Sequence, residues 1–367
     1  MQHGVDPTDR PFRVDRRRVL ISVGLAIVLA AGAIGLIGEV ANYGRITRAL
    51  TEAHHAWLIG CLIGELLAYI GYILAYRDVA RVGDGPVLPF WTVTRVVVIG
   101  FGAFVLGSTP GGLAVDYWAL HRATGDSRDA ARRVLALNTL EWAVLGTFAS
   151  VSAVVLLAGR ADGVPVWLAA AWLVITPVCA VLGVWIARPG RVERLTSEPP
   201  RSRDTAGSAI TRPARKLVVI AREGLGDALA GILVIRVLLR NPLRNWAGII
   251  GFAVYWAGDL LALYAGLKAF QIDVGPARLI VAYTTGYLIT ALPLPVGGAG
   301  TTEATMAWTL NLVGVPFAQG LLAAVAYRLF SFWLPLFPAL AFLPMTGGLA
   351  DDLDRIRSTR FDGPADG

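Results

Sequence analysis

Charged residues are scarce in this chain of 367 residues, because Asp, Glu, Lys and Arg together make up only 16% of it. Soluble domains carry about a quarter charged residues. Hydrophobic residues reach 55%, and the mean hydropathy is +0.60. The composition therefore argues against a soluble enzyme.

Cysteine and histidine are also rare, with two and four residues. Cys61 and Cys179 lie in apolar stretches, and no CxxC or Cys/His cluster occurs. This excludes a disulfide scaffold, a zinc module and an iron–sulfur protein. His54 and His55 are adjacent, so on a helix they would diverge. No nucleophile–base arrangement or phosphate-binding loop is present either. We therefore predict no metal, no cofactor, no catalytic residue and no enzymatic activity.

Lysine is almost absent, since Lys216 and Lys268 stand beside 31 arginines. That bias is typical of a bacterial source with high GC content. The formal net charge of +7 has to be located before it indicates a partner.

Long stretches without any charged residue dominate the rest of the chain. A helix needs about 20 apolar residues to cross the hydrocarbon layer. Seven such stretches could not be enclosed by so little polar sequence, so we predict an all-α polytopic membrane protein. The stretches are 19–38, 96–115, 142–159, 163–187, 279–302, 304–327 and 329–350.

The basic residues predict the orientation. With both termini in the cytoplasm, 27 of the 33 Lys and Arg residues fall on the cytoplasmic side, as the positive-inside rule requires. We therefore expect a multi-pass protein of the bacterial inner membrane. The positive charge then belongs to a membrane-facing surface, and no nucleic acid is expected as a partner.

Two apolar segments contain helix breakers near their middle. The segment near 96–120 is interrupted by Ser-Thr-Pro-Gly-Gly at 108–112, and the segment near 276–314 by prolines and glycines at 293–300. Proline and paired glycines should break a helix there. The arms are then about half a bilayer long, which favours two re-entrant hairpins. The alternative is a kinked spanning helix.

The predicted layout has about six spanning helices and two re-entrant hairpins, with the two halves roughly inverted about the membrane plane. Residues 217–241 are predicted to lie on the membrane surface, with a seventh span as the alternative. The predicted spans are 19–38, 56–76, 135–157, 164–187, 245–267 and 318–343. The predicted regions are a basic N-terminus (1–18), a first half (19–187), a linker (188–216), a surface helix with the second half (217–348), and a tail (349–367).

Broken helices in both halves of a membrane protein indicate a substrate site between them. Glu303 would begin a half-helix whose N-terminus attracts anions, and Arg328 would contact phosphate oxygens. The alternative is a buried Glu303–Arg328 pair without a ligand. Other intramembrane carboxylates, Glu65, Glu141 and Asp259, are interpreted as polar contacts between helices. The predicted substrate-binding residues are Pro110, Gly111, Gly112, Asp116, Gly297, Gly298, Gly300, Glu303 and Arg328.

The second half contains PLPVGGAGTTE at 293–303, Gly314-Val315, and YRL at 327–329 followed by FWLP at 332–335. With these motifs the chain resembles the integral-membrane domain of lysylphosphatidylglycerol synthetases and its stand-alone, flippase-like relatives. The first half is similar through Pro110-Gly111-Gly112 and Asp116-Tyr117. The likeness covers roughly residues 15–348.

In the two-part enzymes of that family, this domain moves aminoacylated phosphatidylglycerol between leaflets and a soluble domain attaches the amino acid. The resemblance therefore implies translocation without synthesis. We expect the cargo to be an anionic or aminoacylated phospholipid, or a polyprenyl-phosphate lipid. The expected partners are membrane lipids, with a cytoplasmic enzyme or a second copy of the chain as further candidates. The alternative function is a non-transporting anchor for a separate cytoplasmic enzyme that modifies lipids or the envelope.

Overall fold

The computed structural model describes residues 24, 28, 51–159, 163–186, 234–237, 245–292, 294, 298–342 and 345–361. These residues form helices, turns and connecting segments, and no strand occurs among them. The linker at 188–216 lies outside the described residues, as do most of the predicted first span at 19–38 and most of the predicted surface helix at 217–241.

Five helical segments are long and apolar enough to cross a membrane, which confirms an all-α polytopic membrane protein. They coincide with five of the six predicted spans. Four are the helices α3 (Ala56–Arg81), α5 (Ser127–Ala158), α6 (Val166–Ile186) and α9 (Trp246–Ala269). The fifth joins α12 (Phe317–Arg328), the π-helical turn η4 (Leu329–Trp333) and α13 (Leu336–Phe342).

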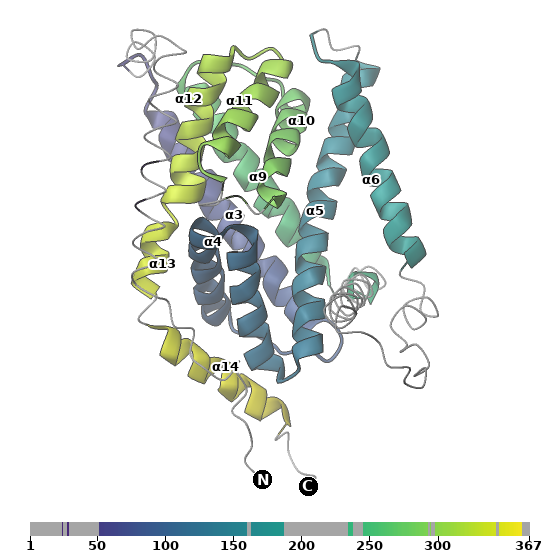
Figure 1. Ribbon diagram of the computed structural model, residues 1–367, viewed down its shortest axis with the longest axis vertical. Helices are drawn as coiled ribbons and strands as arrows, with labels where there is room; N and C mark the ends of the chain where they lie inside the picture. Colours follow the sequence, from purple (N-terminus) through teal and green to yellow (C-terminus); the bar gives the residue numbers. More distant parts are fainter. Residues whose placement is uncertain are drawn as a thin grey trace, which may run out of the picture.

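The helix does not end at the predicted break at 108–112, because α4 runs over Phe90–Thr124 with Pro110 inside it. The chain nevertheless folds back on itself there. The Asp116 carboxylate lies 3.7 Å from the position that a Cβ would take on Gly100, whereas 16 residues of straight helix span about 24 Å. The two arms of α4 lie side by side in Figure 1. Entry and exit of this hairpin on one side of the membrane stays a prediction.

The second interrupted segment consists of α10 (Pro276–Tyr287), the 3₁₀ turn η2 (Leu288–Ala291) and α11 (Thr301–Leu312). Gly286 of α10 approaches Met306 and Thr309 of α11 so closely that a Cβ would lie 3.0 Å from the Met306 Cα. The two short helices therefore pack against each other as a second hairpin. Gly300, directly before α11, has a φ of +83°, a conformation that glycine adopts without steric cost.

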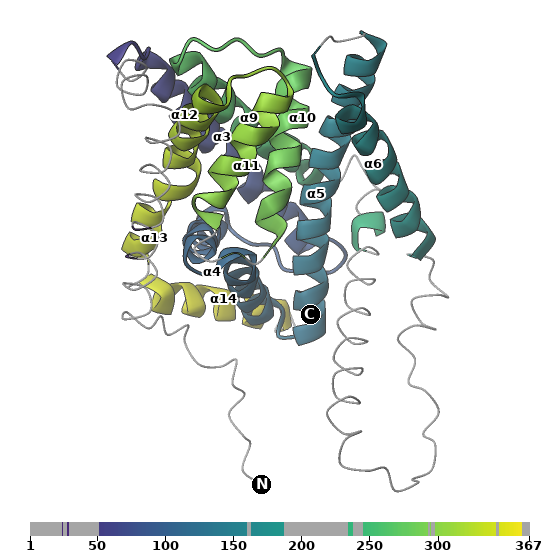
Figure 2. The ribbon, with the colours of Figure 1, turned by 45° about the horizontal axis from the view of Figure 1, so that its top comes forward.

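The two hairpins point toward each other. In Figures 1 and 2, α10 and α11 lie on one side of the molecule and α4 on the other. Val105 near the turn of α4 and Ala299 near the turn of the second hairpin share one apolar cluster with Phe332 and Leu336. The turns of both hairpins therefore meet beside the junction of α12, η4 and α13.

Among the described residues, helices α3 and α9 form the closest helix pair, and they run antiparallel. A Cβ on Gly64 would lie 2.6 Å from the Gly258 oxygen, and one on Gly71 would lie 2.5 Å from the Gly251 oxygen. Small residues permit such backbone contact between membrane helices. Each helix is followed by a hairpin and then by a further helix, α5 or α12. The described parts of the two halves thus repeat one order of elements, and α3 crosses α9; their inversion about the membrane plane stays a prediction.

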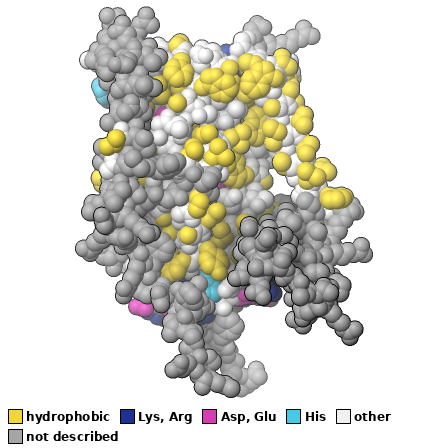
Figure 3. Space-filling model, viewed as in Figure 1, with side chains coloured by type: hydrophobic (Ala, Val, Ile, Leu, Met, Phe, Trp, Pro, Cys, Tyr) yellow, Lys and Arg dark blue, Asp and Glu magenta, His cyan; other side chains and the backbone are white. Residues whose placement is uncertain are grey.

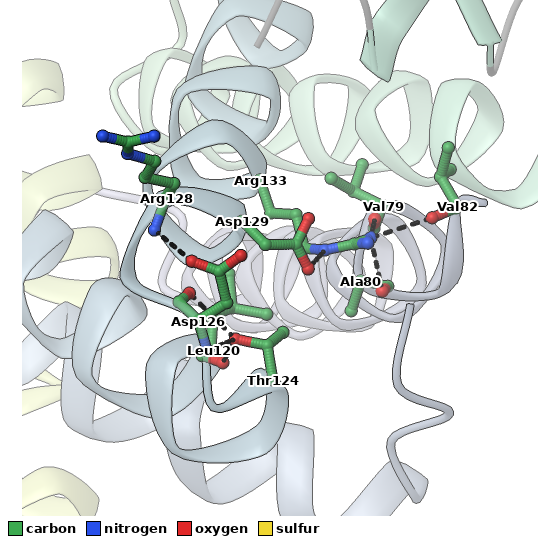
Figure 4. A network of polar contacts seen from close by, with 9 residues as sticks. All are labelled: Val79, Ala80, Val82, Leu120, Thr124, Asp126, Arg128, Asp129 and Arg133. Carbon is green, nitrogen blue, oxygen red and sulfur yellow. Dashed lines mark hydrogen bonds and ion pairs between the residues drawn. The ribbon is translucent and has the colours of Figure 1, made fainter. Parts of the chain in front are cut away.

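Arg133 of α5 holds the end of α3 in place (Figure 4). Its Nη1 donates to the carbonyl oxygens of Val79, Ala80 and Val82 at 3.2, 2.7 and 3.0 Å, and its Nε pairs with Asp129 at 2.9 Å. The last carbonyls of a helix have no partner within the helix. A buried arginine therefore satisfies them here and ties α3 to α5.

A last helix, α14 (Thr346–Phe361), lies across the outer ends of the α4 hairpin (Figure 2). Asp352 pairs with Arg95 on the first arm, and Asp354 pairs with Arg122 on the second arm at 2.6 Å. The predicted tail at 349–367 thus contains a helix that joins the two arms. In Figure 3, hydrophobic side chains cover the upper and middle parts of the visible face, and the coloured charged side chains gather near its lower end.

Candidate functional site

A cavity of about 120 Å³ lies between the α3–α9 crossing and the turns of the two hairpins. Residues of α3, α4, α5, α9, α10, η2, α12 and η4 line it. Since one water needs about 10–15 Å³ on the same measure, the cavity has room for a polar group of several heavy atoms. It therefore lies where the sequence predicts a substrate site, between the two interrupted segments.

Four carboxylates and one arginine line this cavity. Glu65, Asp116 and Asp259 are buried, with 6%, 6% and 4% of their surface exposed, and Glu141 is half-buried. Charges inside a membrane protein are costly unless they are paired. The negative charge of this acidic lining is therefore balanced when a positively charged group or protons bind in the cavity.

Arg328, the last residue of α12, forms a buried ion pair with Glu303 of α11, with 3.2 Å between Nε and Oε1. The other carboxylate oxygen of Glu303 accepts a hydrogen bond from the Gly300 backbone N–H at 2.6 Å. The Arg328 guanidinium also lies 4.1 Å from the centre of the Phe332 ring. The predicted pair is thus present, and the guanidinium also borders the cavity.

This geometry changes the role expected for the N-terminus of α11. The sequence predicts that it attracts an anionic ligand. In the structure, the carboxylate of Glu303 already accepts a backbone N–H there. The protein's own anion therefore takes the place expected for phosphate, and the Arg328 guanidinium is the cationic group that faces the cavity.

Asp259 of α9 is surrounded by tyrosine hydroxyls. Tyr283 of α10 donates a hydrogen bond to its carboxylate, and the Tyr283 hydroxyl lies 3.5 Å from that of Tyr327 on α12. Glu65 of α3 borders the same cavity, and its carboxyl group interacts with that of Asp259. Glu65 Oε1 is buried and has no hydrogen-bond partner among the described residues.

The predicted site residues separate into three groups. Gly112, Asp116 and Arg328 line the cavity, and Glu303 supports Arg328 from behind. Gly298 and Gly300 have positive φ values of +74° and +83° and form the turn before α11. Two others have no place in the lining: Pro110 is exposed, and Gly111 packs against the Ala103 backbone of the opposite arm. Gly297 lies outside the described residues.

Part of the lining was not predicted from the sequence. Glu65, Glu141 and Asp259 were expected to be contacts between helices, whereas all three border the cavity. The five lining tyrosines were not expected either; they are Tyr69, Tyr72, Tyr255, Tyr287 and Tyr327. A signal for two of the carboxylates was available, because Gly-Glu-Leu-Leu-Ala at 64–68 and Gly-Asp-Leu-Leu-Ala at 258–262 repeat one pattern.

The described residues contain no group of three His, Cys, Asp or Glu side chains that could hold a metal ion. The arrangement instead offers carboxylates, tyrosine hydroxyls and one guanidinium around a shared space. These groups bind cations, exchange protons and form hydrogen bonds with polar head groups.

Comparisons with known proteins agree with the fold. A family model described as "Lysylphosphatidylglycerol synthase TM region" matches residues 21–339. The chain is also 23% identical over 341 residues to a "UPF0104 membrane protein" of Methanothermobacter thermautotrophicus. That similarity covers 88% of this chain and 92% of the relative.

Proposed function

Because the chain belongs to the family of the lysylphosphatidylglycerol synthase TM region, we propose that it moves a membrane lipid between the two leaflets. The acidic cavity between the opposed hairpins carries this proposal. The lipid head group would enter the cavity while the acyl chains stay in the bilayer. The family model covers the membrane region, in keeping with translocation rather than synthesis.

The charges of the lining favour a lipid whose head group carries a positive charge. Four carboxylates surround the space, and the one lining arginine already has a carboxylate partner. Electrostatic complementarity of this kind selects among ligands. An aminoacylated phospholipid fits, since its ammonium group would lie between Asp116 and Glu141 and its phosphate near Arg328. A polyprenyl phosphate brings no positive charge and fits the lining less well.

The hairpins give this lipid a path. They would reach the cavity from opposite sides of the membrane, with the charged lower end in Figure 3 facing the cytoplasm. Non-helical backbone at membrane depth is tolerated where it lines a polar cavity. Movement of either hairpin would open the cavity to one leaflet at a time.

A vesicle assay tests the proposal. The purified protein is reconstituted with lipids that carry a fluorescent acyl chain and one of three head groups: lysylphosphatidylglycerol, phosphatidylglycerol or phosphatidylethanolamine. A membrane-impermeant quencher then reports transfer between leaflets. We expect the lysyl lipid to move at least tenfold faster than in protein-free vesicles, and faster than the other two. Rates equal to those of protein-free vesicles for all three lipids would overturn the proposal.

Charge-neutral variants test the selectivity. Asp116→Asn combined with Glu141→Gln should remove the preference for the lysyl lipid, because no carboxylate then faces its ammonium group. The matched control is Asp273→Asn, whose side chain is 83% exposed on the loop before α10. The control should keep the preference of the wild-type protein. An unchanged preference in the double variant would exclude the assigned head-group position.

The alternative expected from the sequence, a non-transporting anchor for a cytoplasmic enzyme, makes the opposite prediction. Deletion of residues 195–212 in the linker would then abolish the cellular phenotype and the recovery of a bound enzyme. For a translocase, the same deletion leaves lipid movement in vesicles intact.

A further inference from the structure

Glu65 and Asp259 occupy equivalent positions in the two halves. Each follows the glycine at the α3–α9 crossing, in the repeated sequences Gly-Glu-Leu-Leu-Ala and Gly-Asp-Leu-Leu-Ala. The contacts repeat in the same way, because Gly64 lies against Ala262 and Gly258 lies against Ala68. The two carboxyl groups therefore face each other beside the α3–α9 crossing, one from each half.

At this contact, Glu65 lacks a hydrogen-bond donor among the described residues. Glu65 Oε1 is buried, borders the cavity and receives no hydrogen bond from the described residues. Two adjacent carboxylates that are both ionised repel each other strongly. A single proton removes this repulsion and turns one carboxyl group into a donor to the other. A metal ion is less suitable, since Ca²⁺ requires six to eight oxygen ligands and no cluster of three ligands occurs among the described residues.

We propose that Glu65 and Asp259 together bind a proton and couple lipid movement to a proton gradient across the membrane. This proposal rests on the lipid translocation proposed above. It adds an energy source to it, in a site that is separate from the expected head-group position at Asp116 and Glu141.

The position of the pair explains how a proton would influence the conformation. With a proton bound, the carboxyl–carboxyl hydrogen bond joins α3 to α9 and so holds the two halves together. Without it, repulsion between the two carboxylates favours their separation. A ligand shifts a conformational equilibrium when it binds one state better than the other. Here the proton binds the state in which α3 and α9 are held together at Glu65 and Asp259. Proton uptake from one side and release to the other would then accompany each change of access.

The surrounding groups suit this role. Tyr283 donates to Asp259, and the Tyr327 hydroxyl lies beside that of Tyr283. Arg328 faces both carboxyl groups while paired with Glu303. The other titratable groups around the pair are Cys61, Tyr69, Tyr255, Tyr287 and Glu141. Tyrosine hydroxyls from four helices thus surround the pair and offer a route for the proton.

The experiment uses vesicles with the lysyl lipid, equal potassium concentrations and valinomycin, so that the membrane potential is zero. A gradient of one pH unit is imposed across them. With one proton per lipid, the steady-state ratio of lipid between leaflets should change about tenfold in the wild-type protein. Glu65→Gln should show no response to the gradient, whatever its rate of lipid movement. Asp259→Asn should behave in the same way.

Two further variants separate coupling from folding. Because the pair is symmetric, the exchange Glu65→Asp with Asp259→Glu should retain the response to the gradient. Glu52→Gln, an exposed glutamate before α3, should respond as the wild-type protein does. The infrared difference spectrum between the wild-type protein and Glu65→Gln should contain a band of a buried protonated carboxyl group.

The outcomes distinguish the two proposals. Wild-type lipid movement that ignores the pH gradient, or that follows a sodium gradient instead, would overturn the coupling and leave translocation standing. A full response to the gradient in Glu65→Gln would overturn the assignment to this pair. A wild-type protein that moved no lipid with or without the gradient would overturn translocation, and the coupling with it.

Discussion

Arg328 and Glu303 form a buried ion pair that joins the end of α12 to the start of α11, with 3.2 Å between Nε and Oε1. Both side chains are at least nine-tenths buried. The same carboxylate accepts the Gly300 N–H, so it also fixes the turn of the second hairpin. The pair therefore has a structural role, while the guanidinium borders the cavity, where we propose that it lies near the lipid phosphate.

Variants of this pair can separate these roles. Glu303→Gln should destabilise the protein by about 3–5 kcal/mol, because it removes one partner of a buried ion pair. Glu303→Gln with Arg328→Met should recover most of this stability, since neither member of the pair is then charged, but should still lose lipid transfer. Thermal unfolding in detergent and the vesicle assay measure the two effects. Normal transfer by the double variant would show that Arg328 serves folding alone.

The glycines of the α3–α9 crossing should tolerate no side chain. In Gly64→Ala and Gly258→Ala, the new Cβ would lie 2.6 and 2.5 Å from the carbonyl oxygen of the facing glycine. Overpacking of this kind costs about 1–3 kcal/mol, and we expect the melting temperature to fall by several degrees. Gly347→Ala is the matched control, because a Cβ there meets nothing within 4 Å. Equal melting temperatures for all three variants would contradict the close crossing.

Helix α14 should hold the outer ends of the α4 hairpin. In Asp352→Asn with Asp354→Asn, the pairs to Arg95 and Arg122 are lost. Partly exposed ion pairs contribute about 0.2–1 kcal/mol each, so the global stability should change little. Amide hydrogen exchange in residues 346–361 should nevertheless rise several-fold. Asp351→Asn, in the exposed neighbouring residue, should leave the exchange unchanged. An equal rise in this variant would show that the two ion pairs do not hold α14 to the α4 hairpin.

Cysteine labelling can test whether the α4 hairpin is re-entrant. Single cysteines replace Asp84, Arg128 or Asp273, which are all exposed, in a background of Cys61→Ala and Cys179→Ser. We expect an impermeant maleimide to label positions 84 and 128 from the same side of the membrane and position 273 from the other. If positions 84 and 128 were labelled from opposite sides, the segment would span the membrane.

The sequence predicted the membrane class and most of the helices, because stretches without charge leave few alternatives in a chain of this hydropathy. It also indicated from prolines and glycines where both segments turn back, and it included a buried Glu303–Arg328 pair as the alternative to a ligand site. The predicted break in the helix at Pro110 was wrong, since α4 is helical throughout Phe90–Thr124 although its two arms fold back on each other. A proline indicates a local distortion, but the packing of the two arms decides its form.

What the sequence determined by itself is therefore what depends on local composition: apolar length, helix breakers and the family motifs. The cavity depends on contacts between residues about 200 positions apart, such as Glu65 with Asp259 and Gly64 with Gly258. Only the tertiary structure could decide that these carboxyl groups face one another, because their meeting follows from the antiparallel crossing of two helices and from no property of either helix alone.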